Sequence, residues 1–334
     1  MSIIKSTLEN IKKKRANAVS GNLNCIPSPY KRFRKDFPGI EKGIMTTITS
    51  FTKGGKSQFT SYTFIYEPLL EAYYGKSNLN LTYLYFPLEE SHSRITERFM
   101  SFLLNRLTKG RIRVSPAELR SVDSENPLPQ EVIDLLESEE YQNILKYFEE
   151  HVIFSSETNP TGIYKFCKRY AEEHGIVATK LVTFKDEFGV TKEMRVFDHY
   201  EPNNENEYII PIIDTLNLVD CEKGMTQKQS MDKMSEYGAK YLRNRYNMCP
   251  IFIQQQAFTA EDNDSFKLGR NKPSVYNLGD SKYTGRDSNL ILGLHSPARF
   301  GQAEYFGYDI RKFNDNIRFL EICVNRDKRI LDYI

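Results

Sequence analysis

The feature that most constrains this chain is the triplet Gly55-Lys56-Ser57, which lies between two apolar segments. The β-branched residues 46–50 before it are typical of a strand, and residues 58–65 after it are typical of a helix. A Gly-Lys-Ser triplet at such a junction is the end of a Walker A loop. The backbone N–H groups of the loop and the helix N-terminus then point at one spot, which suits a phosphate group. A surface turn with the same residues is the alternative, and the flanking strand and helix disfavour it.

The loop predicts a division of roles among its residues. Lys56 would reach the β- and γ-phosphates of a nucleotide, and the Ser57 hydroxyl would bind Mg²⁺. The loop departs from the usual pattern at its first glycine position, which is Ser50 here. The residues predicted to surround the nucleotide are Ser50, Phe51, Thr52, Lys53, Gly54, Gly55, Lys56, Ser57 and Gln58.

Composition adds a few limits. A chain of 334 residues, 40% hydrophobic and 27% charged, can bury a full α/β core. No apolar run approaches the roughly 18 residues of a membrane-spanning helix, so we expect a cytoplasmic protein without a membrane partner. The five cysteines are scattered without metal-ligand spacing, which indicates reduced thiols. The net charge of +2 predicts that any contact with a polyanion comes from local basic patches.

A second acidic signal follows the apolar segment 80–86, which is typical of a buried strand. Glu89 and Glu90 come directly after it. Ligands of open α/β sheets bind at the carboxyl ends of the strands. Glu89 is therefore a candidate general base for hydrolysis, and capping of the following helix is the alternative role.

A third signal is the apolar segment 208–214, which ends in an aspartate. A buried strand that ends in Asp is the Walker B pattern, so we predict that Asp214 holds the Mg²⁺ together with Ser57. Pro211 inside this strand is unusual, because a central strand rarely tolerates proline. A further strand over 250–253 leads into three glutamines at 254–256.

The remaining segments predict appendages and a second binding surface. Residues 1–36 form a basic helix and linker, whose apolar face would dock on its own domain or on a neighbouring subunit, and residues 37–334 form the main domain. A β-hairpin is expected at about 178–198. The polar stretch 257–288 carries cations that suit a nucleic-acid backbone. Its candidate contacts are Arg270, Lys272, Lys282 and Arg286.

The order of these motifs resembles the ATPase domain of DnaB-like replicative helicases, which belong to superfamily 4 and have the RecA fold. The resemblance covers about residues 18–330. It rests on the lead-in 37–43, the phosphate loop, the segments 86–91 and 213–218, and the blocks 250–256, 278–294 and 323–326. It implies an α/β fold with a mostly parallel central sheet flanked by helices.

The resemblance also implies roles for single residues and for partners. Glu89 would activate water, Gln256 would sense the γ-phosphate, with Gln255 as the neighbouring candidate, and Arg326 would reach the γ-phosphate of an adjacent subunit. Arg329 is the rival candidate for this finger. The implied activity is ATP hydrolysis, with Mg²⁺, by a hexameric ring that moves along single-stranded DNA, with primase or a helicase loader as partners. The Lys-, Asn- and Tyr-rich composition is typical of a phage-encoded form, which would act in the host cytoplasm.

Several positions depart from the family. Val324 replaces the lysine that precedes the finger, Gly279 replaces a basic residue of the second DNA loop, and Asn289 replaces an aspartate. We expect the family's N-terminal primase-interacting domain to be absent, with only a short basic helix in its place. These departures leave open a second interpretation, a RecA-like ATPase that does not unwind DNA and acts as a recombination mediator or loading factor on single strands.

Overall fold

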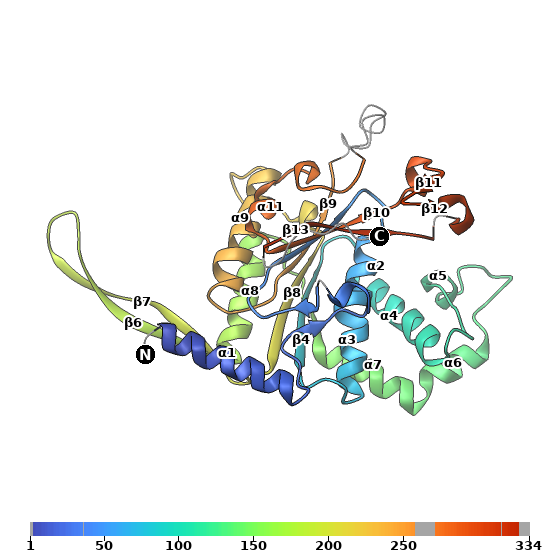
Figure 1. Cartoon of the computed structure of the whole chain (residues 1–334), viewed down its shortest axis with the longest axis horizontal. Coiled ribbons are helices and arrows are strands. Elements are labelled where there is room, and N and C mark those ends of the chain that lie inside the picture. The colour runs from blue at the N-terminus through green and yellow to red at the C-terminus, as the bar shows by residue number, and fades with distance from the viewer. Residues whose placement is uncertain (1–2, 36, 258–270, 315, 327–334) are drawn as a thin grey trace.

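The computed structural model describes residues 3–35, 37–257, 271–314 and 316–326. Seven of its strands form one central sheet (Figure 1). These strands are β3 (Thr46–Ser50), β4 (Asn80–Pro87), β5 (Val152–Phe154), β8 (Glu207–Asp214), β9 (Ile251–Gln255), β10 (Leu290–His295) and β13 (Phe319–Asn325). Their order across the sheet is β13-β10-β3-β9-β8-β4-β5, and only the β10–β13 pair is antiparallel. The predicted α/β class with a mostly parallel sheet is confirmed.

Helices cover both faces of this sheet (Figure 1). Because a parallel sheet is buried on both faces, its strands are nearly continuous apolar runs, and every residue of β8 is buried. One face carries α2 (Lys56–Thr60), α3 (Glu67–Tyr73), α4 (His92–Leu107), α6 (Gln130–Glu137) and α7 (Glu139–His151), and the other carries α8 (Pro160–Glu173) and α9 (Gln227–Glu236). Met231 and Met234 of α9 are buried core residues, as their helical spacing predicted.

Shorter elements complete the fold. Two π-helical segments, Ser61–Tyr66 and Tyr237–Arg243, continue α2 and α9. The remaining helices and strands are α5 (Pro116–Leu119), α11 (Tyr283–Asp287), the pair β1 (Ile26–Pro27) and β2 (Gly39–Ile40), and the pair β11 (Glu304–Tyr305) and β12 (Tyr308–Asp309). Ile26, Phe33 and Phe37 belong to the main hydrophobic core, so the segment after the first helix is packed into the domain.

The predicted hairpin is present as a long two-stranded ribbon, β6 (Gly175–Lys185) and β7 (Thr191–Pro202). It extends away from the body of the protein, at the left of Figure 1. Its base is anchored by aromatic contacts, because the rings of Phe197 and Tyr200 both pack against Tyr246. The ribbon is longer than the expected 178–198 because pairing continues down to the Gly175–Pro202 pair.

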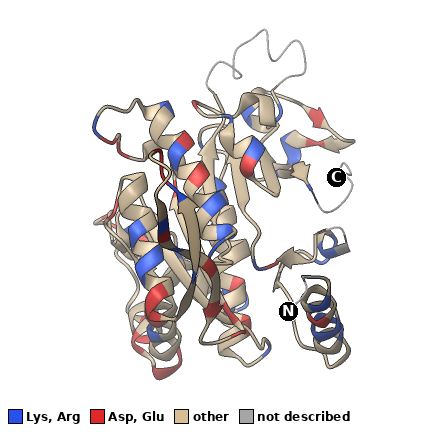
Figure 2. Ribbon diagram, turned by 90° about the vertical axis from the view of Figure 1, so that its left-hand side faces the viewer, with Lys and Arg blue, Asp and Glu red and all other residues tan. Residues whose placement is uncertain are grey.

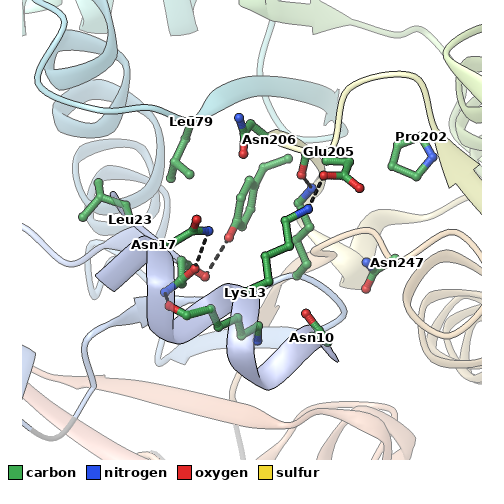
Figure 3. A pocket seen from close by; sticks show the side chains of 13 residues that line it. Asn10, Lys13, Asn17, Leu23, Leu79, Pro202, Glu205, Asn206 and Asn247 are labelled. Atoms are coloured by element: carbon green, nitrogen blue, oxygen red, sulfur yellow. Dashed lines mark hydrogen bonds and ion pairs between the residues drawn. The ribbon is translucent and has the colours of Figure 1, made fainter. Parts of the chain in front are cut away.

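The N-terminal helix α1 (Ile3–Val19) lies on the body through polar contacts (Figure 3). Lys13 pairs with Glu205, and the Asn17 amide donates to Asn24 over 3.0 Å. Lysines and arginines run along the helix (Figure 2), whereas Ile4, Leu8 and Ile11 are exposed. The apolar face of α1 is therefore not covered by the described part of its own chain. Across the described residues, no helix is both long and apolar enough to cross a membrane.

Candidate active site

The predicted phosphate loop is formed by residues 51–55 between the end of β3 and the start of α2. Gly55 has a φ of 90°, a conformation that favours glycine, and it directly precedes the first helical residue. A hollow of about 370 Å³ lies over the loop. The described residues that line it are Thr52, Lys53, Gly54, Gly55, Lys56, Ser57, Gln58, Glu89, Arg98, Thr215 and Gln255. Lys56 and Ser57 therefore lie where a phosphate-binding role requires them.

The unusual Ser50 is accommodated by a glycine four residues later. Ser50 is fully buried under the loop, and its hydroxyl donates to the Phe51 carbonyl over 2.8 Å. A Cβ at Gly54 would come within 2.7 Å of the Ser50 Cβ, which is closer than two side chains can pack. The missing glycine of the usual pattern is thus compensated inside the same loop. Ser50 and Phe51 lie beneath the loop and do not line the hollow.

Asp214 lies at the end of β8, directly beside the phosphate loop. The Ser57 hydroxyl donates to its Oδ1 over 3.0 Å, and the Tyr85 hydroxyl donates to its Oδ2 over 2.8 Å. Burial raises the pKa of the Asp214 carboxyl, while the hydrogen bonds from Tyr85 and Ser57 oppose that rise. The two motifs, 157 residues apart in sequence, are brought into contact at one edge of the sheet.

The Ser57 and Asp214 oxygens fit a magnesium ion. Mg²⁺ is held in proteins by one or two oxygen ligands together with water and substrate phosphates. Within the described ranges, no cluster of three or more His, Cys, Asp or Glu residues forms a metal cage. The pair Ser57 and Asp214 therefore suits an ion that arrives with a nucleotide.

Tyr85 was not singled out by the sequence, although a buried tyrosine hydroxyl needs a partner and this one lies in a predicted buried strand. We expect Tyr85→Phe to remove a hydrogen bond that favours the charged carboxylate, and so to raise the pKa of Asp214 further. Below neutral pH, affinity for Mg²⁺ with a nucleotide should then fall about tenfold, since a hydrogen bond to a charged group contributes on the order of 1.5 kcal/mol or more. Calorimetric titration of Mg²⁺–nucleotide at several pH values measures this. Tyr83→Phe, at a neighbouring tyrosine that donates to the Phe64 carbonyl, is the matched control, and equal shifts in both variants would contradict the prediction.

The two acidic residues after β4 have different surroundings. The Leu88 and Glu89 N–H groups donate to the Asp214 carbonyl oxygen over 2.6 and 3.3 Å, which places Glu89 at the rim of the hollow. Glu90 is paired with Arg98. Glu89 is thus the carboxylate that remains directed toward a bound phosphate.

The three glutamines after β9 alternate in direction, as residues of a strand do. Gln256 is buried, and its amide donates to Thr49 over 2.7 Å and to the Ser274 carbonyl over 3.2 Å. The Gln255 amide donates to the Thr52 hydroxyl on the phosphate loop. The structure does not bring Gln256 to the hollow, and the residue that it brings there is Gln255.

The candidate DNA contacts are only partly gathered. Arg270 lies outside the described residues. Lys282 and Arg286 are exposed on or beside α11, whereas Lys272 lies over the rings of Tyr305 and Phe306, 4.0 Å from Glu321. Arg326 is exposed next to α11, where its N–H donates to the Asn289 carbonyl over 3.0 Å and its guanidinium contacts the Arg286 carbonyl. Arg326 is absent from the described lining of the hollow in its own chain. The rival finger Arg329 also lies outside the described residues.

Two of the departures from the family are built into local packing. A Cβ at Gly279 would lie 2.9 Å from the Gln255 carbonyl oxygen, so a larger residue would displace this backbone. The Asn289 amide oxygen accepts from the Met45 N–H over 3.2 Å and from Arg243 over 2.7 Å. Val324 lies in β13 opposite Ile291 and contributes no cation there.

The fold and this site define a RecA-like α/β domain of the P-loop class. Among solved structures, the chain is similar to one described as the ATPase domain of a helicase, with a TM-score of 0.63, 13% identity, and coverage of 99% of this chain and 94% of that one. It is also similar to a DnaB-like replicative helicase, solved in a study of its interactions with primase, with a TM-score of 0.63, 12% identity, and coverage of 99% and 64%. No protein-family model and no curated protein sequence matches the chain. These similarities establish that the fold is the one found in DnaB-like helicase ATPase domains, as the motifs predicted.

Proposed function

We propose that this chain is an ATP-dependent DNA helicase or translocase of the DnaB-like type, which hydrolyses ATP between subunits of a homo-oligomeric ring, most simply a hexamer. The observation that carries this proposal is the contact between Ser57 and Asp214 beside Lys56, on a fold that DnaB-like helicase ATPase domains share. Phosphoryl transfer depends mainly on positioning and on charge stabilisation, and these residues supply both.

The roles of the side chains follow from their positions. Lys56 and the loop N–H groups hold the phosphates, and Ser57 with Asp214 holds the Mg²⁺ that accompanies them, which neutralises charge on the transferring group. Glu89 accepts the proton of the attacking water at the rim of the hollow. We assign the sensing of the γ-phosphate to Gln255 in place of Gln256, because its amide already contacts the phosphate loop.

Single-stranded DNA is the proposed track of this motor. The exposed cations Lys282 and Arg286, with Lys272 and Arg270 from the same stretch, would contact its phosphates, and DNA affinity should therefore fall as salt rises. Primase or a helicase loader is the proposed protein partner.

We expect DNA-stimulated ATP turnover to distinguish the two acidic residues. Glu89→Gln should lose stimulated hydrolysis by on the order of a hundredfold or more while retaining nucleotide binding, because it removes the general base. Glu90→Gln is the matched control, since Glu90 is engaged with Arg98, and it should stay within a few-fold of the wild type. Phosphate release with and without single-stranded DNA, together with separation of a forked duplex, measures both. Normal turnover in Glu89→Gln would contradict the proposed mechanism, and absence of any DNA dependence in the wild type would contradict the proposed function.

A second candidate function is a RecA-like ATPase that does not unwind DNA and acts as a recombination mediator or loading factor. Val324 favours it, because a valine cannot supply the cation expected beside the finger. Negative-stain microscopy with single-stranded DNA and a slowly hydrolysed ATP analogue separates the two candidates. Closed rings support the helicase, and helical filaments support the second candidate.

A further inference from the structure

The outer part of the β6–β7 ribbon is rich in exposed apolar side chains. A two-stranded ribbon alone is marginally stable in water, and an apolar surface on a soluble protein commonly marks an interaction site. Val182 and Met194 face each other across the ribbon, and Phe184 follows on the same face. The exposed apolar residues of this part are Leu181, Val182, Phe184, Phe188, Val190 and Met194.

The tip of the ribbon presents Phe188 in a fixed position. The Asp186 carboxylate accepts the N–H groups of Phe188 and Val190, both over 3.0 Å, and it also pairs with Lys192 over 2.8 Å. Gly189, with a φ of 77°, closes the turn. Phe188 is 82% exposed on this pinned turn. A side chain held in this way loses little conformational entropy when it is buried in an interface.

A receptor of matching chemistry exists elsewhere on the same chain. A hollow of about 360 Å³ lies beside α2, and the described linings of this hollow and of the phosphate-loop hollow have no residue in common. Phe59 and Tyr30 stack within its wall, with ring centroids 6.0 Å apart. Its aromatic lining includes Tyr30, Phe33, Phe59 and Phe319, and its two cationic residues are Arg32 and Arg318.

We propose that the hairpin tip of one copy of this chain docks in this aromatic hollow of a second copy. Phe188 would fill the apolar space, and the exposed carboxylate of Glu187 beside it would face Arg32 and Arg318. The charges of the two surfaces are opposite, and an aromatic anchor in a pocket with a charged rim is typical of the centre of an interface.

The contact joins two molecules. In Figure 1 the ribbon extends from one side of the protein, whereas β11 and β12, whose Tyr308 lines the hollow, lie at the opposite side. A contact between two different surfaces is heterologous, so it repeats from one copy to the next and builds a ring or a filament. This contact needs neither nucleotide nor DNA, and it therefore goes beyond the proposed function.

Sedimentation velocity of the full chain over a range of concentrations, without nucleotide or DNA, tests the contact. We expect Phe188→Asp to raise the concentration needed for assembly at least tenfold. Val122→Asp places the same charge on another exposed apolar residue, 70% exposed, and should leave assembly unchanged. Circular dichroism confirms that both variants are folded. Equal assembly of the two variants, or a wild-type chain that stays monomeric throughout, would overturn the proposal.

A charge exchange tests the pairing directly. Glu187→Arg and Arg32→Glu should each weaken assembly, and the double variant should recover most of it, because the opposite charges are restored with their positions exchanged. If Arg32→Glu instead weakens nucleotide binding and leaves assembly unchanged, the hollow belongs to the nucleotide and the proposal fails. The assembly measurements contain no ATP, so loss of the proposed ATPase function would leave their outcome unaffected.

Discussion

Replacement of Lys56 by alanine, or of Asp214 by asparagine, should reduce ATP hydrolysis to background. Lys56 would be the cation on the transferring phosphates, and the Asp214 carboxylate, 3.0 Å from the Ser57 hydroxyl, would be a ligand of the accompanying Mg²⁺. Loss of one preorganised electrostatic contact commonly costs on the order of 10²-fold or more in rate. Steady-state release of phosphate from ATP at saturating Mg²⁺ measures the loss.

The two variants should differ in how they bind. Asp214→Asn keeps the loop and its lysine, so it should bind nucleotide in the absence of Mg²⁺ as the wild type does, whereas Lys56→Ala should not. Lys146→Ala removes an exposed lysine on α7 far from the loop in sequence, and it is the control for loss of a positive charge. Full activity in Lys56→Ala, with unchanged thermal unfolding, would show that the hollow is not the site of hydrolysis.

The second large effect concerns Arg326. This residue is exposed and does not contribute to the described lining of the hollow in its own chain, so any role in hydrolysis has to be exerted on a neighbour. A guanidinium that stabilises the transferring phosphoryl group contributes on the order of 10³-fold or more to the rate. We therefore expect Arg326→Ala to assemble and to bind ATP, and to hydrolyse it at least about a thousandfold more slowly.

Mixing of variants shows whether the finger acts in trans. Arg326→Ala subunits mixed with Lys56→Ala subunits should regain part of the activity, because one type of interface then combines an intact loop with an intact arginine. Arg311→Ala serves as a control at another exposed arginine of the C-terminal region. A mixture that demonstrably co-assembles and stays inactive would contradict a finger in trans, and would favour the ATPase that does not unwind DNA.

The parts of the fold that rest on local patterns could be predicted from the sequence. The β-branched run before the loop, the apolar run that ends in Asp214, and the turn at residues 186–189 each specify an element without knowledge of the rest of the chain. The meeting of Ser57 with Asp214 could also be expected, because parallel strands bring their carboxyl ends to one edge of a sheet.

The details that depend on single-residue register could not be predicted. Gln255 and Gln256 are adjacent and chemically identical, and only the pleat of β9 decides which of them faces the loop. The contact of Tyr85 with Asp214 depends on the pairing of β4 with β8, which places the Tyr85–Ile212 pair two residues before the Pro87–Asp214 pair. The place of Arg326 depends on a second subunit, which one sequence does not describe.

The packing of Ser50 against Gly54 restricts the routes by which this loop can change. Only one of the two positions can carry a side chain, since a second Cβ would come within 2.7 Å of the first. A loop with glycine at the first position can therefore reach the present arrangement only through an intermediate with glycine at both positions. Substitution of Gly54 by alanine should be tolerated only in a chain whose Ser50 has already reverted to glycine. The two positions thus behave as one inherited unit, and a search pattern that treats them independently would reject a loop that is sterically sound.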